Sequence, residues 1–192
     1  VAEAEVVITM LKDGPAVEDL LLQQGVADAM RPGTLFIDMS SIAPAEAKEH
    51  ADRLDERKVR YLDAPVSGGT KGATLGELAI MAGGTPEDFA DAEPVFTSMG
   101  RATHVGPIGA GQLCKLANQI IVAITIGAVS EALLLAARGG ADPEAVREAL
   151  MGGFAGSKIL EQHGQRMIDR DFAPGAPARI QLKDLRMILD EA

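Results

Sequence analysis

The sequence has few of the residues that mark several large classes of protein. Its 192 residues include one cysteine, Cys114, so no disulfide can form within the chain, which fits a reducing compartment. Lys and Arg number 18 against 28 Asp and Glu, which gives a net charge of −10. Because a phosphate backbone is bound by clustered Lys and Arg, this balance argues against a nucleic-acid partner. We therefore expect a cytoplasmic protein that binds no nucleic acid.

Three further scarcities argue against a metal site, a membrane span and tyrosine-based chemistry. The three histidines, His50, His104 and His163, lie far apart without metal-ligand spacing, so we expect no metal. The longest uncharged apolar run, residues 116–130, is 15 residues long. A membrane span needs roughly 20, so we expect no membrane partner. Tyr61 has no Lys four positions later, which removes a familiar tyrosine–lysine dehydrogenase pairing.

What the chain does have is a regular alternation of apolar runs and helical patterns in its first half. Hydrophobic residues make up 47% of the sequence, enough for a sizeable core. The β-branched and apolar runs predict strands, and the amphipathic stretches between them predict helices. The strands are expected at 5–11, 34–38, 59–65, 77–84 and 102–106, and the helices at 12–25, 41–58 and 86–93. This order is typical of βαβ units in a parallel sheet.

The pattern changes near Gly106–Gly109, after which only helices are expected. Four helical patterns follow, at residues 110–138, 142–151, 156–169 and 179–191. We therefore predict an α/β fold: a partial Rossmann-type doubly wound sheet in residues 1–107, followed by an all-helical domain in 108–192.

A glycine-rich stretch, "VSGGTKG", follows the third predicted strand, which ends in "DAP". Loops at the carboxyl ends of parallel strands are where α/β sheets bind ligands. Successive backbone N–H groups at Gly68 and Gly69 can form an anion-binding nest, and Ser67 adds a hydroxyl donor. The alternative is a plain tight turn. The serine is not a hydrolase nucleophile, because G-x-S-x-G would require glycine where Pro65 stands.

The long apolar helix carries one lysine near its start. Lys115, Asn118 and Gln119 share one stripe, at i, i+3 and i+4. An ammonium and two amides on one stripe suit a polar pocket, in which the lysine can serve as a general acid or base. The alternative is a lysine that extends its ammonium to solvent.

With "DAPVSGG", the G-x-G-x-x-x-K stretch "GAGQLCK" and "KDL" in this order, the chain resembles the β-hydroxyacid dehydrogenase family over essentially all 192 residues. The stretches "IDMSSIAP", "KLANQIIVA" and "MGGFAGSKILEQHGQRMIDRDFAPG" are more similar to the branch that acts on tartronate semialdehyde than to the 3-hydroxyisobutyrate branch. The resemblance implies a Rossmann domain that binds NAD or NADP, a helical domain used for dimerisation or tetramerisation, and an active site between them.

The resemblance also implies a role for each matching residue. Lys115 would be the catalytic acid/base, Ser67, Gly68, Gly69, Asn118 and Gln119 would bind substrate, and Met10, Leu11, Ser41 and Lys183 would line the cofactor. The implied reaction is reduction of tartronate semialdehyde (2-hydroxy-3-oxopropanoate) to D-glycerate. Two alternatives stay open: a 3-hydroxyisobutyrate dehydrogenase, and a cofactor-free binding or assembly module of the same fold.

The sequence departs from the family most clearly at its ends. The family's G-x-G-x-x-G after the first strand is missing, and so is the later segment that selects NAD or NADP. We therefore expect an incomplete domain pair at both ends.

Overall fold

The computed structural model describes residues 1–192, which form two compact units. The first unit, the sheet unit, consists of residues 1–117 together with 186–192, and the second, the helical unit, consists of 118–185. The division falls inside helix α6 (Ala110–Arg138). The domain boundary expected at residues 107/108 stays a prediction.

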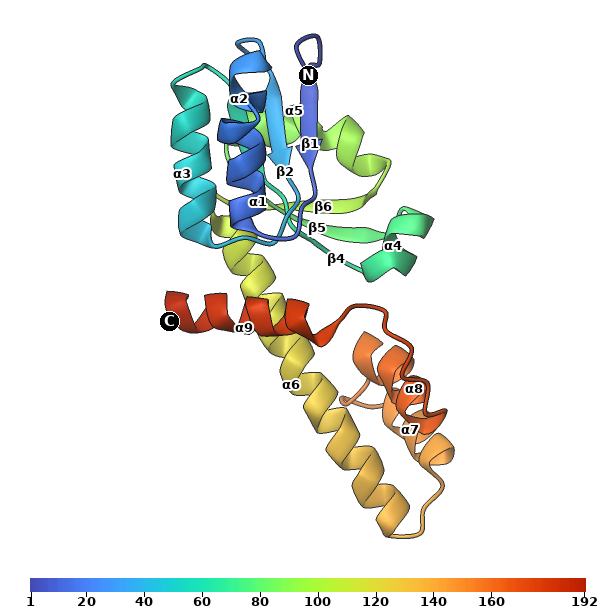
Figure 1. Ribbon diagram of the computed structural model, residues 1–192. Coiled ribbons are helices and arrows are strands. Elements are labelled where there is room, and N and C mark those ends of the chain that lie inside the picture. The colour runs from blue at the N-terminus through green and yellow to red at the C-terminus, as the bar shows by residue number, and fades with distance from the viewer. The chain divides into compact units, whose positions relative to one another are not determined.

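A six-stranded mixed sheet forms the centre of the sheet unit (Figure 1). Its strands are β1 (Val6–Thr9), β2 (Leu35–Asp38), β3 (Arg60–Asp63), β4 (Val66–Ser67), β5 (Leu78–Gly83) and β6 (Gly100–Gly106). β1, β2 and β3 are parallel neighbours, as the sequence predicts. β5 runs antiparallel to β3 and β4, and β6 is parallel to β5. The expectation of βαβ units in a parallel sheet is therefore wrong at β5. The chain reverses its direction between β4 and β5, so that β5 runs antiparallel to both β4 and β3.

Helices cover both faces of this sheet (Figure 1). One face carries α1 (Gly14–Glu18), its π-helical continuation η1 (Asp19–Gln23), α2 (Val26–Ala29) and α3 (Pro44–Asp55), and the other carries α5 (Pro86–Thr97). Each of the three longer helical segments starts with proline in its first turn, where no backbone donor is lost. Asp13 caps α1 by accepting the N–H of Ala16, and Thr85 caps α5 by accepting that of Asp88.

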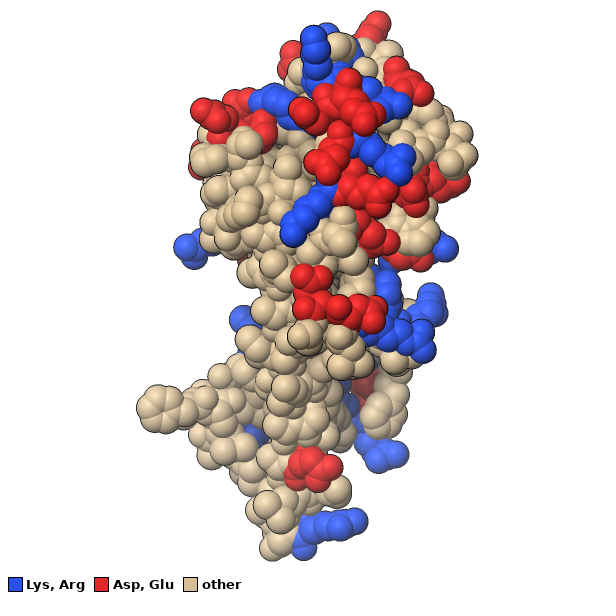
Figure 2. Space-filling view, turned by 90° about the vertical axis from the view of Figure 1, so that its left-hand side faces the viewer, with Lys and Arg blue, Asp and Glu red and all other residues tan.

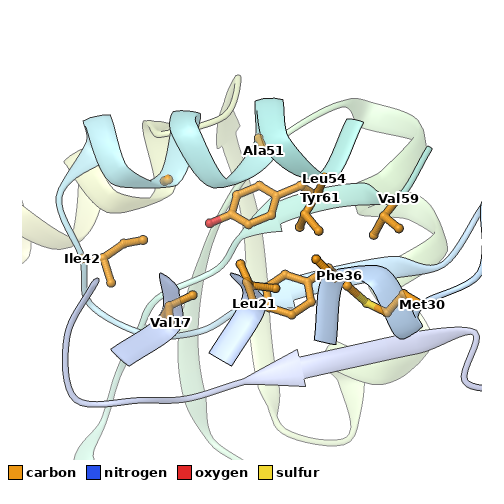
Figure 3. Close-up of a cluster of buried hydrophobic side chains, with 11 residues drawn as sticks. Val17, Leu21, Met30, Phe36, Ile42, Ala51, Leu54, Val59 and Tyr61 are labelled. Carbon is orange, nitrogen blue, oxygen red and sulfur yellow. The ribbon is translucent and has the colours of Figure 1, made fainter. Parts of the chain in front are cut away.

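The alternation of side chains along the strands divides the core into two layers. Phe36 and Tyr61 point into the layer beneath α1 and α3, where their rings stack with centroids 6.0 Å apart (Figure 3). Leu35 and Ile37 point into the opposite layer, against Phe96 of α5. Because neighbouring residues of β2 serve opposite faces, both faces are buried, and the doubly wound α/β class is confirmed.

All four predicted helical patterns form helices, and the first and the last of them each lie partly in the sheet unit. Besides α6 they are α7 (Pro143–Met151), the segment formed by η2 (Leu160–Gly164) and α8 (Gln165–Ile168), and α9 (Ala178–Glu191). Val129, Leu133 and Leu160 form the buried core of the helical unit.

Helix α6 is long and apolar enough to cross a membrane by length and composition alone. Its 29 residues exceed the uncharged run counted above, because the helix extends past Lys115 at one end and Glu131 at the other. Only 11% of its apolar window is buried within the chain, and the absence of a membrane partner stays a prediction. In the face shown in Figure 2, acidic and basic side chains are interspersed over the sheet unit.

Candidate active site

A buried polar network joins the carboxyl ends of β1 and β2. The Thr9 hydroxyl donates to Oδ1 of Asp38 at 2.9 Å, and the Ser40 backbone N–H donates to the same oxygen at 2.9 Å. The Leu11 N–H donates to Oγ of Ser40 at 2.8 Å. Burial raises the pKa of the Asp38 carboxyl, and the hydrogen bonds from Ser40 and Thr9 oppose that rise. The network therefore fixes the loop after β1 against the loop after β2.

These two loops carry three of the residues predicted to line the cofactor. Met10 and Leu11 follow β1 and are 56% and 37% exposed, and Ser41 follows β2. Exposed apolar side chains beside a serine, at the carboxyl ends of parallel strands, suit the flat ring and polar edge of a nicotinamide. The residues present fit that half of a dinucleotide.

The glycine-rich segment is more ordered than a plain loop. Ser67 lies in β4, where it pairs with Ala79, and a short helix, α4 (Gly69–Leu75), follows. The backbone turns at Gly68 and Gly69, whose φ angles are +132° and +61°. Such angles favour glycine, so this sequence is needed for the turn itself. The predicted simple loop is wrong over α4, while the adjacent Ser67, Gly68 and Gly69 stay candidates for anion binding.

Gly69 offers a test of that candidate site. A Cβ at Gly69 would meet no heavy atom within 4 Å, so Gly69→Ala adds only the strain of a left-handed alanine, ~1–2 kcal/mol. If the nest holds a substrate carboxylate, the KM for that substrate should rise about tenfold, because the strained turn shifts its N–H groups. Gly25→Ala is the matched control, since Gly25 has φ +72° and the same open surroundings. Equal KM values in Gly69→Ala and Gly25→Ala would show that the backbone at Gly68 and Gly69 does not bind the substrate carboxylate.

The first turn of α6 is held by the end of β3. Oδ1 of Asp63 accepts the N–H of Gly109 and Oδ2 accepts the N–H of Gln112, each at 2.8 Å. Asp63 is fully buried. Burial raises its pKa from 3.8 to about 7, although both N–H groups favour the carboxylate.

The Gln112 side chain extends this connection to the loop after β2. Its Nε2 donates to the carbonyl of Ser40 at 2.9 Å, and its Oε1 accepts the N–H of Ile42 at 3.2 Å. Ser41 lies between these two residues, so its loop is hydrogen-bonded to the helix that carries Lys115. Lys115 is 9% exposed, so its side chain does not extend freely into solvent. The sheet unit thus carries a buried lysine three residues after the glutamine that binds the Ser41 loop.

The helical unit gathers a second polar group around Asp184 of α9. Nε2 of Gln119 donates to Oδ2 of Asp184 at 2.5 Å, and Nδ2 of Asn118 donates to Oε1 of Gln119 at 2.9 Å. Nζ of Lys183 lies 3.2 Å from Oδ1 of Asp184. Taken alone, "QLKDL" suggests a solvated face with an ordinary Lys–Asp pair. The pair is present, but the interpretation is wrong for Asp184, which is 1% exposed.

The predicted site residues therefore fall into two groups. Those of the sheet unit are Met10, Leu11, Ser41, Ser67, Gly68, Gly69 and Lys115, and those of the helical unit are Asn118, Gln119 and Lys183. Four buried polar side chains that support these groups were not predicted from the sequence, namely Asp38, Asp63, Gln112 and Asp184. A signal existed for two of these: Asp38 and Asp63 end neighbouring apolar strands and stand opposite each other in the sheet.

No three His, Cys, Asp or Glu side chains are grouped so that they could hold a metal ion.

A doubly wound sheet with its polar groups at the carboxyl ends of the strands, followed by helices, defines the class of dinucleotide-binding oxidoreductase folds. Residues 1–109 match the family described as the NAD binding domain of 6-phosphogluconate dehydrogenase. Residues 109–192 match the family described as NAD-binding of NADP-dependent 3-hydroxyisobutyrate dehydrogenase.

Individual relatives agree with these matches. The chain is 50% identical to 2-hydroxy-3-oxopropionate reductase of Escherichia coli, over 98% of this chain and 65% of that protein. It is 37% identical to 3-hydroxyisobutyrate dehydrogenase of Pseudomonas aeruginosa, over 98% of this chain and 66% of that protein. Among solved structures, 3-hydroxyisobutyrate dehydrogenase of Mycobacterium tuberculosis with L-serine is similar with a TM-score of 0.87 and 35% identity, covering 100% of this chain and 68% of that one.

The chain belongs to the NAD-binding β-hydroxyacid dehydrogenase family, as the order of its motifs predicts. It spans about two thirds of the length of these relatives, 65% in the case of the E. coli reductase.

Proposed function

We propose that the full-length protein reduces tartronate semialdehyde to D-glycerate with NADH or NADPH. The observation that carries this proposal is the 50% identity to a 2-hydroxy-3-oxopropionate reductase, against 37% to a 3-hydroxyisobutyrate dehydrogenase, over the same share of the chain. The buried Lys115 near the start of α6 supports the proposal, because it can serve as the general acid.

Lys115 is the proposed general acid. When bound, a reduced nicotinamide dinucleotide supplies the hydride that the aldehyde carbon takes up. Negative charge then builds on the carbonyl oxygen, and the Lys115 ammonium donates a proton to it. In the opposite direction the neutral amine accepts the proton of the hydroxyl. General acid help of this kind typically contributes roughly 10²–10⁴-fold in rate.

The remaining predicted residues orient the reactants. The backbone N–H groups of Gly68 and Gly69 and the Ser67 hydroxyl hold the substrate carboxylate, so that the aldehyde presents one face to the hydride donor. Orientation of this kind contributes several kcal/mol to lowering a barrier. Asn118 and Gln119 are the remaining proposed substrate contacts. In the structure the Gln119 amide is bonded to Asp184 and Asn118, so a contact with substrate requires it to exchange one of these partners.

Met10, Leu11, Ser41 and Lys183 are the proposed cofactor contacts. The exposed apolar side chains after β1 support the first two, and the hydrogen-bonded loop after β2 supports Ser41. The ion pair of Lys183 with the buried Asp184 keeps its ammonium beside the polar group of the helical unit.

The substrate is tested by following oxidation of NADH and of NADPH by the full-length protein with two semialdehydes. We expect kcat/KM for tartronate semialdehyde to exceed that for methylmalonate semialdehyde by about 100-fold, because a pocket that hydrogen-bonds the extra hydroxyl rejects a methyl group. The reverse preference would favour a 3-hydroxyisobutyrate dehydrogenase, which the P. aeruginosa and M. tuberculosis relatives keep as the second candidate. No oxidation with either substrate would favour a binding or assembly module.

The proposed setting is a cytoplasmic homodimer or homotetramer. Exposed apolar side chains on α6 and α9, among them Ile121, Ile124 and Leu182, support an assembly in which helical surfaces are covered. The acidic net charge of −10 supports a small-molecule substrate in preference to a nucleic acid.

A further inference from the structure

Asp63 connects the end of β3 to the start of α6, and the proposed chemistry leaves it without a role. Its two carboxylate oxygens accept the N–H groups of Gly109 and Gln112, which are 46 and 49 residues further along the chain. The first N–H groups of a helix have no partner within the helix. A negative charge there is also favoured by the helix dipole. The first turn of α6 therefore obtains its cap from another element.

The first turn of α6 packs so closely against β3 and β5 that no side chain fits between them. A Cβ on Gly111 would lie 2.4 Å from the carbonyl oxygen of Met81 and 2.5 Å from that of Asp63. A Cβ on Gly83 would lie 2.5 Å from Oδ1 of Asp63. Backbone atoms of α6 thus contact β3 and β5 with no room for a side chain between them. Gly109, with φ +87°, provides the turn that leads into the helix.

Lys115 lies three residues after Gln112 on the same helix, ~4.5 Å further along the axis. Residues at this spacing lie on one face, so Lys115 follows any shift of the turn that Asp63 holds. A displacement of ~1 Å can cost a reaction about 100-fold in rate. Since Asp63 holds the turn with both oxygens, a change at Asp63 would shift the backbone that carries Lys115.

We propose that Asp63 is a positioning residue for Lys115, which it orients by capping the first turn of α6. The inference rests on the proposed function, in which Lys115 transfers the proton. It assigns Asp63 no contact with substrate or cofactor.

The test compares Asp63→Asn with the wild type in the full-length protein. Asparagine has the same shape, but its NH₂ group cannot accept the second backbone N–H. We expect kcat to fall about 10- to 100-fold while the KM for the semialdehyde stays within about threefold, because the lost group acts on proton transfer and not on binding. Asp88→Asn is the matched control. Asp88 is a buried carboxylate at the start of α5 and should leave kcat unchanged.

The double variant Asp63→Asn, Lys115→Ala separates positioning from a general effect on the fold. If Asp63 acts through Lys115, the double variant should be no slower than Lys115→Ala alone. Losses that multiply would overturn the inference, as would an unchanged kcat in Asp63→Asn. If Lys115→Ala itself keeps full turnover, Lys115 is not the general acid, which is a different result.

Hydrogen exchange in the wild type tests the cap without any variant. The amide protons of Gly109 and Gln112 should exchange far more slowly than those of an unstructured peptide, since both are bonded to a buried carboxylate. Exchange of either amide at the peptide rate would overturn the inference even if Asp63→Asn failed to fold.

Discussion

Lys115→Ala is expected to lower kcat for semialdehyde reduction by about 10²–10⁴-fold in the full-length protein. Alanine leaves the developing charge on the carbonyl oxygen without a positioned proton donor, which corresponds to ~3–5 kcal/mol of barrier. The dissociation constant of the nicotinamide cofactor should change little, because the cofactor contacts proposed for Met10, Leu11 and Ser41 remain. Steady-state kinetics and cofactor fluorescence titration measure the two quantities separately.

A second lysine variant shows whether such a loss is specific. Lys158 also lies outside the sheet, but its side chain is 82% exposed and pairs with Glu161 at 3.0 Å. Lys158→Ala should keep wild-type kcat, because an exposed ion pair contributes little. A Lys115→Ala protein that is folded and turns over near the wild-type rate would show that another group transfers the proton.

The helices and strands that could be predicted are those whose sequence shows both a hydrophobic pattern and residues that mark where the element begins and ends. Residues 110–138 were predicted as a helix and form α6 with the same bounds, because Gly109 precedes the apolar stretch and Gly139 and Gly140 follow it. Helix α4 was missed, because glycine-rich sequence has low helix propensity. It forms through tertiary packing: a Cβ at Gly68 or Gly72 would lie 3.3 Å from Leu78 of β5.

The candidate site could be predicted for its lysine and its glycines, but not for the carboxylates that support them. Lys115 stands out as the single charge before a 15-residue uncharged run, and Gly68 and Gly69 stand out by composition. Asp63 does not, because its role depends on Gly109 and Gln112, which only the folded chain brings within 2.8 Å. The burial of Asp184 in "KDL" could not be predicted for the same reason, because it depends on tertiary packing that the local sequence does not show.

The buried Asp63 also predicts how the stability of the sheet unit depends on pH. The carboxyl has a pKa of about 7 in the folded protein and about 3.8 when exposed, because burial disfavours its charge and the nearby Asp38 adds to this. Between these values the folded state binds a proton that the unfolded state has released. The contribution of Asp63 is therefore fully present below pH about 4 and is lost as the pH rises through 7.

Asp63→Asn removes this titration, so the wild type should lose stability relative to the variant as the pH rises from 4 to 7. A shift of about 3 units corresponds to at most ~4 kcal/mol in the free energy of unfolding. Denaturant unfolding of both proteins across this pH range measures the difference in their free energies of unfolding. Both proteins contain Asp38, so the pH dependence that Asp38 contributes largely cancels in this difference. If instead the wild type gains stability relative to the variant as the pH rises, the N–H groups of Gly109 and Gln112 outweigh burial and keep Asp63 ionised. A carboxylate held by strong donors has a lowered pKa, so its contribution to the free energy of unfolding is lost at acid pH.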